Sequence, residues 1–435
     1  MYVKPEYILI ILFIVIANYL LGFYIEKSSD KRRRQYLNIS LGINLGILIF
    51  YKYWNFALSN FFDFLGLLRI NYSIPFFEIA LPLGLSYYIF QTIGYNLDIY
   101  RGSIKAEKKI LDFSLFTLFF PKLLVGPIER AHRFLPQLKE KIYFNQNNIV
   151  KGSKRIIWGL FKKLVVADRI FIYQTAIFAS SQEQSGATLA LASILYTFQV
   201  YADFSGYTDI AIGTARLFGY DLMENFKQPL LAKNIGDFWR RWHISLSTWV
   251  NDYIFNPVAL HHRQWGKWSI FYALLISFVV IGVWHGASWN YVVFGLLQAF
   301  ALIYEFSTRK IRNQWSKKTM KAFYNPISIL FTFLFITFSL IVFRSENFMD
   351  AVYFVRGIFT NSGNLFIDKP STIIFIITGI TVMMLNDLQV EYKTFKYSLL
   401  SNNNWLIQQL SYAALIIYIL IAGVFDGGQF IYFAF

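Results

Sequence analysis

Long apolar stretches alternate with short basic segments along the whole chain. About 20 mainly apolar residues cross the hydrocarbon core of a bilayer as a helix. The stretch 268–304 has no Asp, Glu, Lys or Arg and is too long for one helix, so it predicts two short spans or a bent hairpin. Clear single spans are predicted at 7–25, 35–56, 79–97, 184–202, 323–343, 370–386 and 405–425.

Three further segments need separate interpretation. Residues 156–181 are a weaker span because charges such as Lys162 and Asp168 interrupt them. Residues 113–121 are too short to span and end in Pro121, which suits a re-entrant or interfacial segment. The first apolar run is followed by basic residues and no small-residue cleavage site, so we expect a retained span rather than a signal peptide.

The basic segments set the expected orientation. Residues 27–34, 101–109, 130–155 and 307–321 are rich in Lys and Arg, which predicts that they face the cytoplasm. About ten spans satisfy this arrangement. Both termini and the 344–369 connection then face outside. The pattern predicts an all-α polytopic membrane protein, with residues 1–435 as a single domain in a lipid bilayer.

Composition agrees with a membrane protein and excludes several chemistries. The chain is 56% hydrophobic and only 15% charged, below the usual charge content of soluble domains. Its net charge is +16, but the basic residues flank apolar runs, so we do not expect nucleic acid binding. Cysteine is absent, which excludes disulfides, thiolate metal sites and a catalytic cysteine. We expect neither a metal nor a permanently bound cofactor.

Residues 203–267 are polar, aromatic and rich in glycine, and they do not fit a simple span. Long non-spanning segments inside membrane proteins are usually functional or buried in protein. Within this stretch, residues 237–256 predict one amphipathic helix along the cytoplasmic boundary, started by Asp237 and ended by Pro257. Helical spacing puts Trp239, Trp242, Leu246, Trp249 and Tyr253 on one face and Arg240, His243, Ser247 and Asn251 on the other.

The polar face of this predicted helix carries candidate site residues. Arg240 and Arg241 oppose the dipole at its N-terminal turn, so we expect anionic partners, either phosphates or internal carboxylates. The polar face suits the wall of a cavity with His243 toward it, or equally a lipid-facing interfacial helix. Asp203 and Asp209 follow an apolar run, and we expect them to pair structurally with Arg240 or Arg241.

His285 is the strongest catalytic candidate among the five histidines. It lies in IGVWHGASW inside the longest uncharged stretch, where an ionisable residue indicates function. Gly282 and Gly286 flank it and allow close approach of backbone or substrate. A buried neutral imidazole suits a general base, although a histidine that hydrogen-bonds two helices is the structural alternative. The other histidines are expected in a polar loop (His261, His262) and at the interface (His132), and Ser205 is a weak nucleophile candidate.

Five ordered segments resemble the membrane-bound O-acyltransferase (MBOAT) family, and more narrowly its bacterial alginate O-acetyltransferase branch. They are PLGLSYYIFQ (82–91), GPIERAHRF (126–134), YADFSGYTDIAIG (201–213), FWRRWHISLSTWVNDYIF (238–255) and WHGASWNYVVFG (284–295), and the resemblance extends to the C-terminal GGQFIYFAF. It implies many helices around a central funnel, with His285 catalytic and His243 a second important polar position. We assign Arg240, Arg241, Trp284 and Asn251 to substrate binding.

The resemblance also implies a reaction. The donor is an acyl thioester such as acetyl-CoA, reached from the cytoplasm. The acceptor is a hydroxyl of a cell-envelope polysaccharide, often reached through an extracytoplasmic partner acyltransferase, and the protein is expected in the bacterial cytoplasmic membrane. D-alanyl transfer to teichoic acid, a transporter or flippase, and a passive scaffold for an envelope complex remain the alternatives.

Overall fold

The computed structural model describes residues 7–70, 82, 84–367, 369–393, 400 and 402–425, and every regular element in this part is helical. The N-terminal helices are α1 (Tyr7–Lys27), α2 (Asp30–Leu48) and α3 (Trp54–Leu67), with a π-helical turn at Ile49–Tyr53 that joins α2 to α3. The next helices are α4 (Leu85–Tyr100), α5 (Ile110–Leu118), α6 (Ala131–Lys139), α7 (Gln146–Leu160), α8 (Asp168–Ala179) and α9 (Gly186–Leu217).

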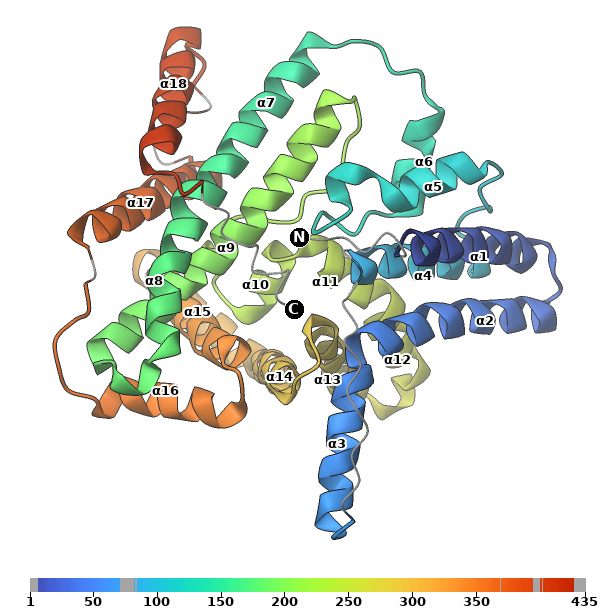
Figure 1. Ribbon diagram of the computed structural model, residues 1–435, viewed down its shortest axis with the longest axis horizontal. Coiled ribbons are helices and arrows are strands. Elements are labelled where there is room, and N and C mark those ends of the chain that lie inside the picture. The colour runs from blue at the N-terminus through green and yellow to red at the C-terminus, as the bar shows by residue number, and fades with distance from the viewer. Residues whose placement is uncertain are drawn as a thin grey trace.

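Three short helices follow α9, and six longer ones complete the described chain. The short ones are α10 (Ile235–Arg241), α11 (Ile244–Val250) and α12 (Asn256–His261). The remaining helices are α13 (Lys267–His285), α14 (Trp289–Lys318), α15 (Lys321–Arg344), α16 (Phe348–Thr360), α17 (Pro370–Tyr392) and α18 (Trp405–Ala422). Figure 1 shows α10 and α11 near the centre of the molecule with longer helices around them, while α3 projects away from the rest.

Six described helices are long and apolar enough to cross a membrane: α1, α13, α14, α15, α17 and α18. These confirm helices at the predicted spans 7–25, 323–343, 370–386 and 405–425, and the uncharged stretch 268–304 forms two helices as predicted. Helices of this number and kind indicate a multi-pass membrane protein. Both ends of the chain, including GGQFIYFAF, lie outside the described residues, as do 79–81 and 83 of the predicted 79–97 span.

Three predicted spans have a different form in the structure. The expected 35–56 span begins earlier, at Asp30, and continues through the π turn into α3. The expected 184–202 span continues without a break to Leu217, because the sequence 203–213 is part of α9 and not of an irregular segment. Neither α2 nor α9 is among the six helices apolar enough to span on their own. The weaker candidate 156–181 is divided among α7, a π-helical stretch at Phe161–Ala167, and α8.

Glycines let α9 pack directly on α7 and on the π-helical stretch that follows it. A methyl group on Gly159 would lie 2.6 Å from the carbonyl oxygen of Gly206, and one on Gly152 would lie 2.7 Å from that of Gly213. Small residues at such contacts bring helix backbones close together, which is how helices associate where lipid gives no hydrophobic driving force. The glycines of YADFSGYTDIAIG therefore serve the α7–α9 contact.

Candidate active site

His285 is the last residue of α13, at the turn into α14. Its side chain is buried and packs against aromatic rings, with its ring centroid 5.1 Å from that of Phe343 and 6.1 Å from that of Phe294. A methyl group on Gly282 would lie 2.2 Å from the carbonyl oxygen of Tyr291, so glycine is required where α13 and α14 meet. The close approach predicted beside His285 is confirmed, and the group that approaches Gly282 is the backbone of α14.

Lys52 caps the end of α13. Its Nζ donates hydrogen bonds to the carbonyl oxygens of Trp284 at 2.6 Å and His285 at 3.1 Å. A cation at a helix C-terminus satisfies carbonyls that lack intrahelical partners and interacts favourably with the helix dipole. Lys52 therefore holds the backbone that carries His285. Lys52 was not among the predicted site residues, because its only local signal is a single cation inside a predicted span.

His243 lies between α10 and α11 with a left-handed backbone, at φ 43° and ψ 53°. The predicted single helix over 237–256 is therefore wrong, because the chain changes direction at His243 and the two predicted faces do not continue through it. Asn234, not Asp237, caps α10, and the helix at Asn256–His261 continues past Pro257. The prediction that the tryptophans are buried is confirmed for Trp239, Trp242 and Trp249.

Asn225 fixes the chain immediately after His243. Its side-chain oxygen accepts hydrogen bonds from the backbone N–H of Ser245 at 3.0 Å and from the Ser245 hydroxyl at 2.9 Å. Its backbone oxygen accepts one from the N–H of Ile244 at 3.0 Å. The Ser245 hydroxyl also accepts a hydrogen bond from the backbone of Ile128 in the GPIER motif. These bonds stabilise the left-handed turn, which is uncommon for a residue other than glycine.

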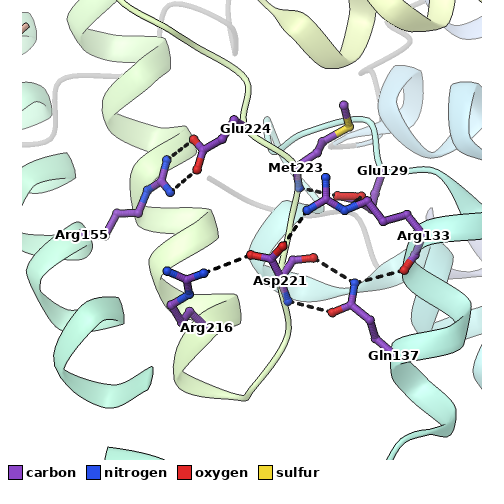
Figure 2. A network of polar contacts seen from close by, with 8 residues as sticks. All are labelled: Glu129, Arg133, Gln137, Arg155, Arg216, Asp221, Met223 and Glu224. Carbon is purple, nitrogen blue, oxygen red and sulfur yellow. Dashed lines mark hydrogen bonds and ion pairs between the residues drawn. The ribbon is translucent and has the colours of Figure 1, made fainter. Parts of the chain in front are cut away.

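A polar network anchors the loop that carries Asn225 (Figure 2). Asp221 lies between two arginines, accepting from Arg133 at 2.7 Å and from Arg216 at 3.2 Å. The guanidinium of Arg155 meets the carboxylate of Glu224 with two hydrogen bonds, and the N–H of Met223 donates to Glu129 at 2.9 Å. Charge-assisted bidentate contacts of this kind fix orientation as well as position. The loop is thus held to α6, α7 and α9.

The indole of Trp284 lies between the two histidines. Its ring centroid is 4.9 Å from that of His285 and 5.6 Å from that of His243. His243 is buried, and neither of its ring nitrogens has a hydrogen-bond partner among the described residues. Burial lowers the pKa of the His243 imidazole well below its usual value, and the nearby His285 acts in the same direction. His243 is therefore neutral at physiological pH.

One cavity of about 500 Å³ lies beside this centre, between α10, α11 and α13. Arg240 and Asn251 line it, together with Trp239, and the Arg240 side chain is largely exposed. His243 is not among the lining residues, so the prediction that it faces this cavity is not met. The α13 residues at the cavity, such as Ser277, precede His285 by about 6 to 16 Å along the helix axis.

Arg241 has a different environment from Arg240. Its guanidinium makes two hydrogen bonds to the Glu391 carboxylate, at 2.8 and 2.9 Å, and one to Asp237 at 3.1 Å. The expectation of anionic partners is confirmed for Arg241 as internal carboxylates. Within the described chain, the ion-pair partner of Arg240 is Asp237, at 3.6 Å.

A second cavity of about 270 Å³ lies on the other side of the α13–α14 turn. It is lined by residues at the start of α14 and the end of α15, including Ser288 and Arg344. Gln174, Tyr196 and Gln199 line this cavity, and their buried side-chain oxygens lack hydrogen-bond partners among the described residues. This second cavity is therefore rich in groups able to bind a hydroxylated ligand.

Asp203 and Asp209 pair with other cations than predicted. Asp203 binds Lys163 at 2.7 Å. Asp209 binds Lys162 at 2.5 Å and Arg155 at 2.9 Å. The predicted pairing with Arg240 or Arg241 is wrong, because α9 continues as a helix and presents both carboxylates to α7 and the π-helical stretch after it. Ser205 likewise accepts a hydrogen bond from Lys162 at 2.9 Å.

The other three histidines lie in polar surroundings. His132 has an exposed side chain 4.0 Å from Asp98. His261 is exposed at the end of α12, and the ring of His262 contacts that of Trp265 at a tilt, with the centroids 4.3 Å apart.

The chain belongs to the membrane-bound O-acyltransferase family, whose sequence model matches residues 105–344, more than half of the chain. Both histidines at the centre of the structure, their tryptophans and the α7–α9 contact fall inside the matched region. The protein is accordingly an O-acyltransferase.

Three relatives show which branches the chain is similar to. A probable alginate O-acetylase from Pseudomonas putida is 32% identical over 352 residues, covering 80% of this chain and 70% of the relative. The peptidoglycan O-acetyltransferase of Helicobacter pylori is 31% identical over 79% of this chain and 68% of its own length. The teichoic acid D-alanyltransferase of Bacillus subtilis is 30% identical over 61% of this chain and 69% of its own length.

The chain spans about two thirds of the length of further curated relatives. Its match covers 65% of the probable alginate O-acetylase of Azotobacter vinelandii and 64% of that of Pseudomonas syringae.

Proposed function

We propose that this protein transfers an acyl group, in the first place acetyl, from a cytoplasmic thioester such as acetyl-CoA to a hydroxyl of a cell-envelope polysaccharide or of an extracytoplasmic partner protein. The observation that carries the proposal is a buried histidine at a helix turn with a separate cavity on each side. The cavity with Arg240 suits a phosphate-bearing donor, because an exposed guanidinium binds phosphate well. The cavity beside Ser288 suits a hydroxylated acceptor.

The reaction assigns a proton path to His285. The neutral imidazole accepts the proton of the acceptor hydroxyl while the oxygen attacks the thioester carbonyl. The new C–O bond forms, the C–S bond breaks, and the proton leaves with the sulfur as a free thiol. General base catalysis of this kind contributes about 10²- to 10⁴-fold to rate. His243 assists by orienting the donor or by stabilising the oxyanion, and Trp284 keeps the two imidazoles apart at fixed distance.

The proposed orientation puts the donor cavity on the cytoplasmic side of the bacterial cytoplasmic membrane. The basic end of α14 and the α1–α2 turn face the cytoplasm, and the α15–α16 connection faces outside, following the Lys and Arg bias. About ten spans around a central funnel complete this arrangement. α14 begins at the α13–α14 turn beside the acceptor cavity and ends at its basic residues, so its direction agrees with this orientation.

His285→Gln tests the proposal, because glutamine keeps a polar group of similar reach but is no base. We expect loss of about 10²- to 10⁴-fold of O-acylation, measured by mass spectrometry of envelope glycans from cells carrying either form. The control is His262→Gln, which changes a partly buried histidine that contacts Trp265 just after α12. Near-normal acylation with His285→Gln and a correctly inserted protein would make His285 a structural residue.

D-alanyl transfer to teichoic acid is the second candidate, favoured by the similarity to the Bacillus subtilis enzyme. It uses the same hydroxyl attack on a thioester, but its acyl group carries an ammonium. The same glycan analysis distinguishes the two by the mass of the group that is lost.

A further inference from the structure

A third cavity, of about 620 Å³, lies between α9, α15 and α17, and His285 is not among its lining residues. Leu330 on α15 and Tyr392 on α17 line it and are exposed, so the cavity opens at the surface as a groove, which we call the α15–α17 groove. Both α15 and α17 are among the helices apolar enough to cross a membrane. Lipid is therefore the solvent that reaches this opening.

The lining of the groove changes from polar to apolar along its length. Its polar residues lie where α15 begins and α17 ends, and they are Lys321, Asn325 and Tyr392. Further along the same two helices the lining is apolar, with Phe333 on α15 and Met384 on α17. A phospholipid has the same order of groups, a polar headgroup followed by hydrocarbon. The groove therefore suits an amphiphile that lies along α15.

The length of the groove matches one leaflet of a bilayer. Lys321 and Phe333 are twelve positions apart on α15, which is about 18 Å at the rise of an α-helix. Half of the hydrocarbon core of a bilayer is about 15 Å thick. An acyl chain whose headgroup lies beside Lys321 therefore reaches the inner end of the groove.

The charge at the polar end of the groove is positive. Lys321 is exposed and has no ion pair within the described ranges of the chain. Lys317 and Lys318, both exposed, end α14 just before it across a short turn. Glu391 lies at the end of α17, but both of its carboxylate oxygens accept hydrogen bonds from Arg241. Ammonium groups placed beside membrane-spanning helices attract anionic headgroups.

We infer that the α15–α17 groove binds an acyl chain of an anionic phospholipid, with the phosphate beside Lys321. The inference does not depend on acyl transfer. A second copy of this chain, related by a two-fold axis, would bring the same lysines to the same place, where like charges repel each other. The lipid also covers Leu230 and Leu231 in the 3₁₀ turn just before α10, so it stabilises the chain that leads to Arg240.

Lipid binding to the purified full-length protein tests the inference. The protein in detergent is titrated with phosphatidylglycerol and with phosphatidylcholine of the same acyl chains, and lipid adducts are measured by native mass spectrometry. We expect phosphatidylglycerol to bind about 5-fold more tightly, because the lysines attract its net negative headgroup. Lys321→Gln should abolish this preference. The matched control is Lys310→Gln, which removes an exposed lysine of α14 that does not line the groove and should keep the preference.

Filling the groove tests where the acyl chain lies. Leu330→Trp places an indole in the groove and should remove the adducts of both lipids. Leu334→Trp changes an exposed leucine one turn further along α15 that does not line the groove, and it should bind lipid as the unchanged protein does. Lipid retained by Leu330→Trp, or lost equally from both variants, would overturn the inference.

Glycerol phosphate distinguishes a lipid from a free phosphate, because it carries the anionic group without acyl chains. It should give no adduct at the concentrations where phosphatidylglycerol does. Binding as tight as that of phosphatidylglycerol would mean a phosphate site that does not use the groove. Equal binding of the two phospholipids, or a preference that Lys321→Gln keeps, would likewise overturn the inference.

Discussion

Lys52 decides the geometry of the site at the scale of single residues. Its partly buried ammonium binds the last two carbonyls of α13, and its hydrocarbon stem reaches them from the π-helical turn Ile49–Tyr53 that follows α2. Hydrogen bonds to a charged group contribute about 1.5–3 kcal/mol each when a partner is removed. The position of His285 thus depends on a residue from a distant part of the sequence.

Lys52→Met keeps the stem and removes the two hydrogen bonds. We expect unfolding in detergent at a lower temperature and acyl transfer reduced by 10-fold or more, because the turn at His285 loses its cap. Thermal melting and thiol release measure the two effects. Lys27→Met removes an exposed lysine at the end of α1 and should change neither. Full activity in Lys52→Met would show that the α13 end is held by other contacts.

The burial of His285 was predictable from the sequence and is confirmed, whereas the contact made by Lys52 was not predictable, for a physical reason. A histidine in a long uncharged run can be recognised from the neighbouring sequence alone, because the free energy of placing an ionisable group in lipid is unfavourable whatever its partner is. The importance of Lys52 depends on carbonyls more than 230 positions away, which no local pattern reports. The same limit explains why Asp203 and Asp209 were given the wrong partners.

At the scale of helices, glycines allow α7 and α9 to pack closely against each other. Gly159→Ala adds a methyl group 2.6 Å from the Gly206 carbonyl oxygen, so α7 and α9 must separate. We expect a loss of about 1–3 kcal/mol in the free energy of unfolding, measured by denaturation in detergent. Gly42→Ala on α2 meets nothing within 4 Å and should be neutral or stabilising. Equal stability of the two variants would contradict the close α7–α9 contact.

The turn at His243 gives a second prediction at this scale. Asn225→Ala removes the acceptor of two hydrogen bonds from Ser245 and frees the chain after His243. Acyl transfer should fall by 10-fold or more, because the imidazole loses its fixed position. Asn347→Ala, which removes the N-cap of α16, should cost about 1 kcal/mol of stability and leave transfer unchanged. A comparable fall in both variants would indicate general destabilisation instead.

The helical spacing of polar and aromatic residues in 237–256 does not predict this turn. The polar and aromatic positions of 237–256 repeat at helical spacing, and α10 and α11 are indeed helical on either side of His243. The break comes from Asn225 and Ile128, whose bonds to residues 244 and 245 outweigh the local preference for a continuous helix. Propensity is a weak prior when tertiary bonds compete with it.

Topology is the prediction that belongs to the whole molecule. The chain contains no cysteine, so single cysteines report position directly. Ser29→Cys and Trp315→Cys should resist an impermeant thiol reagent in intact cells and react after lysis. Ser362→Cys, beyond α16, should react in intact cells. Labelling of positions 29 or 315 from outside would invert the proposed orientation and, with it, the assignment of donor and acceptor cavities.

The contact between Lys52 and the end of α13 also determines when, during synthesis of the chain, the active site can form. The ribosome adds Lys52 long before Trp284 and His285, so the turn after α2 is made before the carbonyls that its ammonium binds. Every shorter nascent chain contains the lysine without the carbonyls that it binds. The active site therefore closes only after translation has passed residue 285, in a step that joins the earliest helices to the middle of the chain. An N-terminal segment taken from another enzyme would have to deliver a cation to the same place for that step to occur.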